Sequence, residues 1–384
     1  MRKASHTDHI LESGGFCLHR LVGKYWKLSS FTGQTLVITT ICAVVMFLSS
    51  LIDGTLYLTG RDVGFVEHPA VWGFLLLQTV LPISVARSIV KLSHTKIEEG
   101  EIVNKPDECS DLILPSVREF LKLGDRYSRL AAGLFYTMGL VALVINSIQN
   151  QFPHVWVPYD FWDSSTHLFG YIVTRFYKAY LFIVLLPYLA LVHTAILAST
   201  LRVIRNSRIA GHLRLLPFHP DRSGGLSFVA GLISKPIILT LLVGGGTTAG
   251  ALLVHRAVNL TPAFGIGLLL SWAILAYIVP ILFLRMDIVS MKRELIKKIR
   301  RAQQIRYLKV LDGQPLESRV LEDENEALEY FDRVCNRIDG ISSFPHWKRL
   351  FGSLSLALTP SLITFVLNSV GGLSAIMARL TAPP

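Results

Sequence analysis

Hydrophobic residues along this chain gather in long runs that alternate with polar segments. Seven runs have the length of a membrane helix: 35–53, 69–87, 131–148, 179–201, 236–255, 264–284 and 353–378. About 20 apolar residues in a helix cross the hydrocarbon core of a bilayer. The runs contain no Asp or Glu before their boundaries. The pattern therefore predicts an all-α membrane protein with seven transmembrane helices.

Between the sixth and seventh runs, the pattern becomes that of two charged amphipathic helices. Apolar residues recur every three or four positions through the first of them: Ile288, Met291, Leu295, Ile299, Ala302 and Ile305. This spacing marks one face of a helix, and basic residues occupy the remainder. Acidic residues dominate the segment from Glu317 to Asp332, and Gly313 and Pro315 separate the two helices. The segment 286–345 therefore predicts a long helical hairpin.

These elements divide the chain into four parts. An N-terminal tail covers 1–34, and a six-helix membrane domain covers 35–285 with polar inserts at 91–130 and 202–235. The charged hairpin follows, and 351–384 holds the last transmembrane helix with a short tail. The first insert is long enough for one or two helices that lie at the membrane surface.

Composition and charge agree with the prediction of a membrane protein and also predict its orientation in the membrane. The 384 residues are 51% hydrophobic and 17% charged, with a mean hydropathy of +0.46, which is too apolar for an ordinary soluble protein. The tail 1–34 lacks an apolar core, so we expect the first run itself to direct insertion. Of the 38 Lys and Arg residues, 33 fall in the tail, at the start of the fifth run, or beside and after the second, fourth and sixth runs. The positive-inside rule then predicts a multi-pass protein of the inner membrane, with a cytoplasmic N-terminus.

The basic cytoplasmic face has a consequence for partners. The net charge of +11 follows from the orientation, so it implies no specific nucleic-acid partner. We expect this face to attract anionic lipids. On the other side, the segment 149–177 is crowded with aromatic residues. It is expected to lie flat in the membrane interface, and an aromatic substrate vestibule is the alternative.

The polar stretch 201–236 concentrates the most distinctive side chains. Pro217 and Pro220 stiffen its centre, and a helix that begins after the Gly-Gly pair would point its N-terminus at several basic groups. A helix N-terminus beside basic side chains binds anions. The predicted anion or phosphate site consists of Arg214, His219, Asp221, Arg222, Ser223, Gly224 and Gly225. The alternative is a rigid capped elbow that lipid head groups touch non-specifically.

The string PFHPDRSGGL within this stretch carries two resemblances. His-Pro-Asp is also the tripeptide of the J-domain of co-chaperones, but the fourth and fifth runs lie too close together to leave room for that domain's flanking helices. The longer string is similar to a signature of uncharacterised bacterial multi-pass membrane proteins with a cytoplasmic His-Pro-Asp-x-x-Gly-Gly-Leu loop. That resemblance covers ten residues and implies no activity.

Within the runs, a few residues suggest packing or function. Gly246 and Gly250 form a small-xxx-small pair, which predicts close helix packing and, with the hairpin, a homo-oligomer. His193 is the ionisable residue deepest in a predicted span, and it is either functional or a structural residue bonded to a neighbouring helix. One face of the last run carries Ser361, Thr364 and Asn368. That face predicts either the lining of a narrow aqueous path or hydrogen bonds between helices.

Catalysis finds little support in the sequence. There is no nucleophile elbow, zinc-protease motif or Walker loop. The four cysteines, Cys17, Cys42, Cys109 and Cys335, lack metal-ligand spacing, so no metal or cofactor is expected. Ion-coupled carriers commonly use carboxylates inside their spans, and these runs have none before their boundaries.

Two functions therefore remain. The first is a channel- or pore-like conduit that responds to an anionic cytoplasmic ligand at Arg214, His219, Asp221 and Arg222. The alternative is a non-conducting membrane-anchored signalling or scaffold protein. It would recruit a soluble cytoplasmic partner through the hairpin 286–345.

Overall fold

The structure is a computed structural model. It describes residues 17–26, 30–59, 62–98, 101–105, 113–122, 124–151, 162–216, 279–311 and 318–342, together with the single residues 218, 226, 238, 352, 355 and 359. These residues are mostly helical, which confirms the predicted class. Among the described residues, four helical segments are long and apolar enough to cross a membrane, namely Phe31–Ile52, Val71–Ser93, Arg126–Ile145 and Leu168–Ile209. They match the first four predicted runs. Nearly all of the fifth and seventh runs and most of the sixth lie outside the described residues.

The first two spans form an antiparallel pair. Helix α3 (Phe31–Ile52) begins at Ser30, whose hydroxyl accepts the backbone N–H of Gly33. Helix α4 (Pro69–Ser93) begins with proline, which suits a first helical turn because that turn leaves its N–H groups unbonded. Pro82 lies inside α4 without ending it. Helix α6 (Arg126–Gln151) supplies the third span.

The fourth span is one long rod made of three consecutive segments. They are α8 (Leu168–Ala179), the π-helix η2 (Tyr180–Leu185) and α9 (Leu186–Ile209). Its 42 residues extend about 63 Å at 1.5 Å per residue, twice the roughly 30 Å of a hydrocarbon core. The rod begins eleven residues before the predicted start at 179. The last part of the aromatic segment, from Leu168 on, is therefore part of this helical rod and not of a separate loop. The charge of Lys178 is neutralised by the Asp163 carboxylate. The lysine can therefore lie within the helix instead of marking its end.

Helix α6 meets the π-helix at Gly139. A Cβ atom at that position would lie only 1.9 Å from the carbonyl oxygen of Phe182, so only glycine allows this approach of the two backbones. The next proline, Pro187, has no N–H to donate to that carbonyl. The π-helix leaves the carbonyl of Phe182 without a proline N–H donor, and Gly139 lets α6 pack closely against that carbonyl.

The insert 91–130 contains an element that the helical prediction missed. Strands β1 (Thr95–Glu98) and β2 (Glu101–Asn104) pair antiparallel, with Ile97 opposite Ile102. Strands of four residues are too short for their alternation to be recognised. Helix α5 (Leu114–Leu121) follows and packs against α9.

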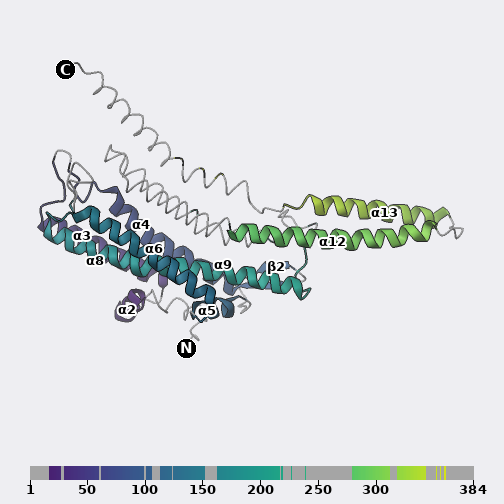
Figure 1. Cartoon of the computed structure of the whole chain (residues 1–384), viewed down its shortest axis with the longest axis horizontal. Coiled ribbons are helices and arrows are strands. Elements are labelled where there is room, and N and C mark those ends of the chain that lie inside the picture. Colours follow the sequence, from purple (N-terminus) through teal and green to yellow (C-terminus); the bar gives the residue numbers. More distant parts are fainter. Residues whose placement is uncertain are drawn as a thin grey trace, which may run out of the picture.

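The predicted hairpin is confirmed as a pair of helices, α12 (Val279–Leu311) and α13 (Ser318–Asp339). Figure 1 shows it projecting beyond the end of α9, away from the bundle of α3, α4, α6 and α8. Its base has a small apolar core of Leu284, Ile288, Met291, Val334, Ile338 and Ile341. An ion pair of 3.0 Å between Arg208 of α9 and Asp287 of α12 joins the rod to the hairpin.

Candidate intramembrane site

Polar residues follow one side of α3 from its second turn to its end. Thr35, Thr39, Cys42, Ser49 and Asp53 are spaced by three, four or seven positions, which places them on one face of the helix. Their neighbours come from α4 and α8. We define the polar seam as these five residues with Gln78 and Thr79 of α4 and Thr174 and Tyr177 of α8.

The Thr35 end of the seam is covered by a short helix, α2 (Cys17–Trp26). Nε2 of His19 lies 3.1 Å from the Thr35 hydroxyl oxygen. The His19 ring stacks on Phe31 with a centroid distance of 4.7 Å. Burial lowers the pKa of His19 to about 4, so the ring is neutral at pH 7.

The middle of the seam has both satisfied and unsatisfied polar groups. The hydroxyl oxygens of Thr79 and Thr39 are 3.0 Å apart, and the Gln78 amide nitrogen lies 3.7 Å from the sulfur of Cys42. Three buried atoms of the seam have no hydrogen-bond partner among the described residues: Gln78 Oε1, Thr174 Oγ1 and Tyr177 OH. These atoms need a donor or acceptor from elsewhere, and water is the usual one.

Met46 interrupts the seam. It lies on the same face of α3, between Cys42 and Ser49, and is only 1% exposed. A thioether cannot replace the hydrogen bonds of a hydroxyl or amide. The seam is therefore closed at this level by an apolar and flexible side chain.

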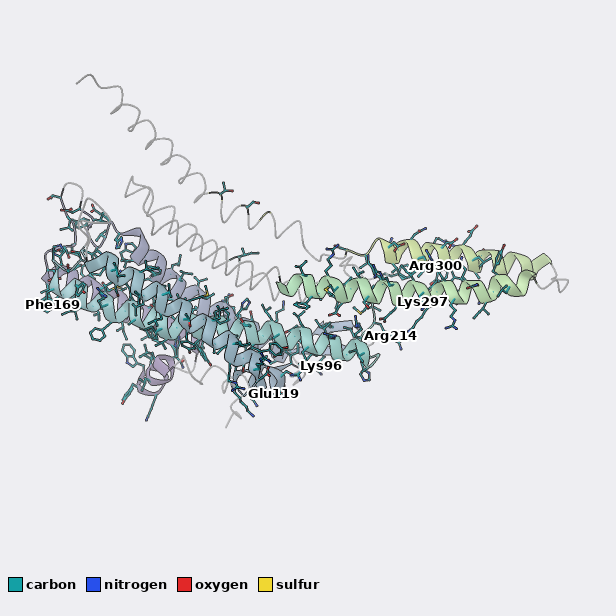
Figure 2. The ribbon with its side chains drawn as sticks, in the orientation of Figure 1. Lys96, Glu119, Phe169, Arg214, Lys297 and Arg300 are labelled. Carbon is teal, nitrogen blue, oxygen red and sulfur yellow. The ribbon has the colours of Figure 1, made fainter. Side chains whose placement is uncertain are left out.

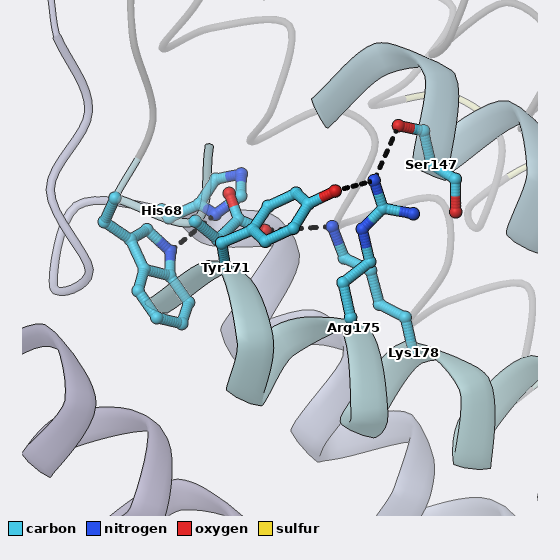
Figure 3. A network of polar contacts seen from close by, with 7 residues as sticks. His68, Ser147, Tyr171, Arg175 and Lys178 are labelled. Carbon is cyan, nitrogen blue, oxygen red and sulfur yellow. Dashed lines mark hydrogen bonds and ion pairs between the residues drawn. The ribbon is translucent and has the colours of Figure 1, made fainter. Parts of the chain in front are cut away.

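The Asp53 end is a dense network of partnered groups, which we call the clamp: Asp53, His68, Trp162, Asp163, Gly170 and Lys178. The Lys178 ammonium lies 2.9 Å from the Asp163 carboxylate, with the two side chains 10% and 2% exposed. The Trp162 indole N–H donates to Nδ1 of His68 over 3.2 Å. These bonds fix the loops before α4 and α8 to the bundle (Figure 3).

Two further contacts complete the clamp. The Asp53 carboxylate accepts the backbone N–H of Gly170 at 2.6 Å, so α3 holds the first turn of α8. The pKa of His68 is lowered to about 4, and burial of the ring is the main cause. The charges of Asp163 and Lys178 have smaller effects. Asp163 opposes this shift and Lys178 adds to it. His68 is therefore neutral at pH 7, as an acceptor of the indole hydrogen bond must be.

Arg175 extends the network toward α6. Its guanidinium donates to the carbonyl oxygen of Ser147 at 3.0 Å and to the hydroxyl of Tyr171 at 2.7 Å. Figure 3 shows Arg175 and Lys178 reaching to the same side of α8. Nε of Arg175 is buried and has no partner within the described ranges.

The sequence-predicted sites fall largely elsewhere. His193 is buried in α9, 3% exposed. Arg214 is exposed and follows the end of α9, and Figure 2 shows it far from Phe169. His219, Asp221, Arg222, Ser223, Gly224 and Gly225 lie outside the described residues, as do Gly246, Gly250, Ser361, Thr364 and Asn368. His193 and Arg214 are separated by most of α9 and do not form one site.

Sequence reasoning missed the polar seam, although one signal was present. The first run looks uniformly apolar because threonine, serine and cysteine are small and only weakly polar. Their spacing along α3 was the available clue. Gln78 is a single residue of the second run and Tyr177 lies just before the fourth run, and only the packing of three helices brings them together.

The side chains of the seam can donate and accept hydrogen bonds. In the described residues, no group of three His, Cys, Asp or Glu side chains could hold a metal ion. Hydroxyl, amide and thiol groups can bind water and pass hydrogen bonds along a row. Comparisons of the chain with family models, curated proteins and solved structures found no match.

Proposed function

We propose that this protein is a passive conduit for small polar species in the inner membrane, and that the polar seam forms part of its path. The observation that carries the proposal is the set of three buried atoms without partners, Gln78 Oε1, Thr174 Oγ1 and Tyr177 OH. Each unsatisfied buried group costs about 1–3 kcal/mol. Water in the seam would remove that cost, and a row of such waters is a narrow hydrated path.

The length of the seam fits this role. Thr35 and Asp53 are 18 residues apart on the α3 side, which corresponds to about 27 Å at 1.5 Å per residue. A hydrocarbon core is roughly 30 Å thick. Polar groups therefore extend across nearly the whole membrane, and Met46 is the point at which the path is shut.

The proposal includes a route by which a cytoplasmic ligand could open the path. An anion bound at Arg214 would lie just after the end of α9 and could shift that helix. The Arg208–Asp287 ion pair links α9 to the hairpin. Helix α9 continues through η2 into α8, which carries Thr174 and Tyr177. A shift of the rod along α3 would thus move one wall of the seam.

Flux into proteoliposomes tests the conduit. The full chain is reconstituted, and the entry of protons and of potassium is followed with dyes, with protein-free vesicles as the baseline. Met46→Ala should raise the flux because it removes the block without any ligand. Adding Gln78→Leu and Tyr177→Phe to Met46→Ala should lower the flux again. If vesicles that contain the Met46→Ala protein stay as tight as empty ones, the proposal is wrong.

A matched pair of threonines controls for general effects. Thr39 belongs to the seam, whereas its neighbour Thr40 is exposed and bonds only to the backbone of its own helix. In the Met46→Ala background, Thr39→Val should reduce flux and Thr40→Val should leave it unchanged. Equal effects would show that the seam is not the path.

A second function, recruitment of a soluble partner, is supported by the far half of the hairpin. Apolar side chains that are buried at its base give way to exposed ones further out: Ile305, Tyr307, Leu308 and Tyr330 are 50–55% exposed. Exposed apolar groups that lie together mark interaction sites. Arg300 and Arg301 lie nearby on α12, so an acidic partner would fit. Deleting 291–333 should then abolish recruitment and leave any flux partly intact.

A further inference from the structure

The short helix α2 differs from the other helices in its direction and exposure. In Figure 1 it is seen nearly end-on beside helices that run along the picture, so it lies across the bundle. One side contacts α3 through His19 and the stacked ring of Phe31. Leu21, Tyr25 and Trp26 are 49%, 75% and 59% exposed, although they are apolar or aromatic.

The position of α2 along α3 defines the environment of these exposed residues. Helix α2 ends at Trp26, only four positions before the cap of α3 at Ser30. Because α3 has the length and composition of a span, its first turn lies at the edge of the hydrocarbon. A helix that lies across the bundle at this level runs along the membrane surface.

The residue types agree with a lipid surface. Tryptophan and tyrosine rings concentrate at the boundary between head groups and hydrocarbon. Helices that lie in this boundary carry basic residues on their polar side, and Lys24 of α2 is exposed. Lipid already surrounds the start of a span, so a soluble protein would have to displace it to reach α2.

We propose that α2 is a membrane-surface helix. Leu21, Tyr25 and Trp26 insert into the head-group region of the leaflet at the Thr35 end of α3, and Lys24 contacts lipid phosphates. This anchor holds His19 against Thr35, so α2 covers one end of the polar seam. The lipid contact of α2 does not depend on the proposed conduit, whereas its role as a cover of the seam rests on that conduit.

Spin-label depth measurements in the full chain test the lipid contact. Cys17, Cys109 and Cys335 are replaced by serine, and the partly buried Cys42 is kept. The protein that has no added cysteine is the blank, so that any label on Cys42 is subtracted. A label is attached at Tyr25→Cys in phosphatidylcholine–phosphatidylglycerol vesicles. Its collisions with oxygen, which prefers lipid, are compared with those of a water-soluble nickel complex. Controls are Val44→Cys on the exposed face of α3 and Leu308→Cys on the hairpin.

The proposal predicts an intermediate depth for position 25. The label should be less accessible to the nickel complex than the label at 308, and less accessible to oxygen than the label at 44. Accessibility to the nickel complex equal to that of position 308 would overturn the anchor. A label shielded from both reagents would also overturn it, because a protein surface would then cover α2.

A flux measurement separates this proposal from the conduit. The double change Leu21→Glu with Tyr25→Glu should raise the nickel accessibility of a label at Trp26→Cys. If the conduit is correct, it should also raise proteoliposome flux by releasing the cover. A change in depth with no flux in any variant, Met46→Ala included, would support the anchor and contradict the conduit.

Discussion

The clamp and the middle of the polar seam are both buried and polar, but they differ in how their groups are satisfied. In the clamp, Lys178 faces Asp163 and Trp162 donates to His68. In the seam, Gln78 and Tyr177 each keep a buried atom that has no partner among the described residues. A satisfied polar network fixes one geometry, whereas unsatisfied groups cost free energy unless something else binds them. The clamp therefore holds one fixed arrangement, whereas the seam keeps polar groups that can still bind another donor or acceptor.

The largest effect is expected when the clamp loses a charge. Lys178→Ala leaves the Asp163 carboxylate buried, 2% exposed, without its cation. Breaking a buried pair in this way costs about 3–5 kcal/mol. Chemical unfolding of the protein in detergent micelles should show that loss.

The control for this change removes both charges. Asp163→Asn with Lys178→Met should recover most of the stability, because no uncompensated charge remains. If Lys178→Ala alone is nearly neutral, water reaches the pair and the clamp is not the rigid part of the molecule.

The clamp also shows what the sequence could and could not predict. A membrane helix needs a long apolar run, so the first four spans were predictable. The hairpin was predictable from apolar residues that recur every three or four positions among charged ones. Lys178 and Arg175 were placed outside the fourth span because a charge normally ends an apolar run. Their partners, Asp163 and the carbonyl of Ser147, lie 15 and 28 residues away, and no local pattern indicates such pairings.

The second largest effect is a dependence of stability on pH through His68. Its pKa falls from an ordinary 6.5 to about 4 in the folded protein. Between these values the unfolded chain binds the proton and the folded one does not, so stability decreases as pH falls from 6.5 to 4. The loss should reach about 3 kcal/mol at pH 4.

The histidine itself supplies the control. His68→Asn removes the titrating group while an amide oxygen can still accept the indole hydrogen bond. Unfolding free energies of the variant and the parent, measured at several pH values, should differ in slope only between pH 4 and 6.5. Parallel curves would mean that His68 is accessible to solvent and that the clamp opens readily.

A smaller effect is expected from added bulk in the clamp. A Cβ atom at Gly170 would lie 2.4 Å from the carbonyl oxygen of Trp162 and 3.4 Å from the Asp53 carboxylate. Gly170→Ala should therefore destabilise the protein by about 1–3 kcal/mol. At Gly133 nothing lies within 4 Å of such an atom, so Gly133→Ala should be neutral or stabilising by up to about 1 kcal/mol. Thermal unfolding of the two variants makes the comparison, and similar shifts would contradict the close packing at Gly170.

The smallest effect tests the comparison most directly, because the same substitution is made in the network that extends the clamp and in the seam. Tyr171 accepts a hydrogen bond from Arg175 at 2.7 Å, so Tyr171→Phe should cost about 1–2 kcal/mol. The Tyr177 hydroxyl is buried without a partner among the described residues. If the seam is dry, Tyr177→Phe removes a desolvated group and should stabilise by up to about 1 kcal/mol. If water fills the seam, that gain disappears because the hydroxyl is already bonded, and flux in the Met46→Ala background should fall instead. A stability gain combined with unchanged flux would therefore remove the seam from the path while leaving the clamp as described.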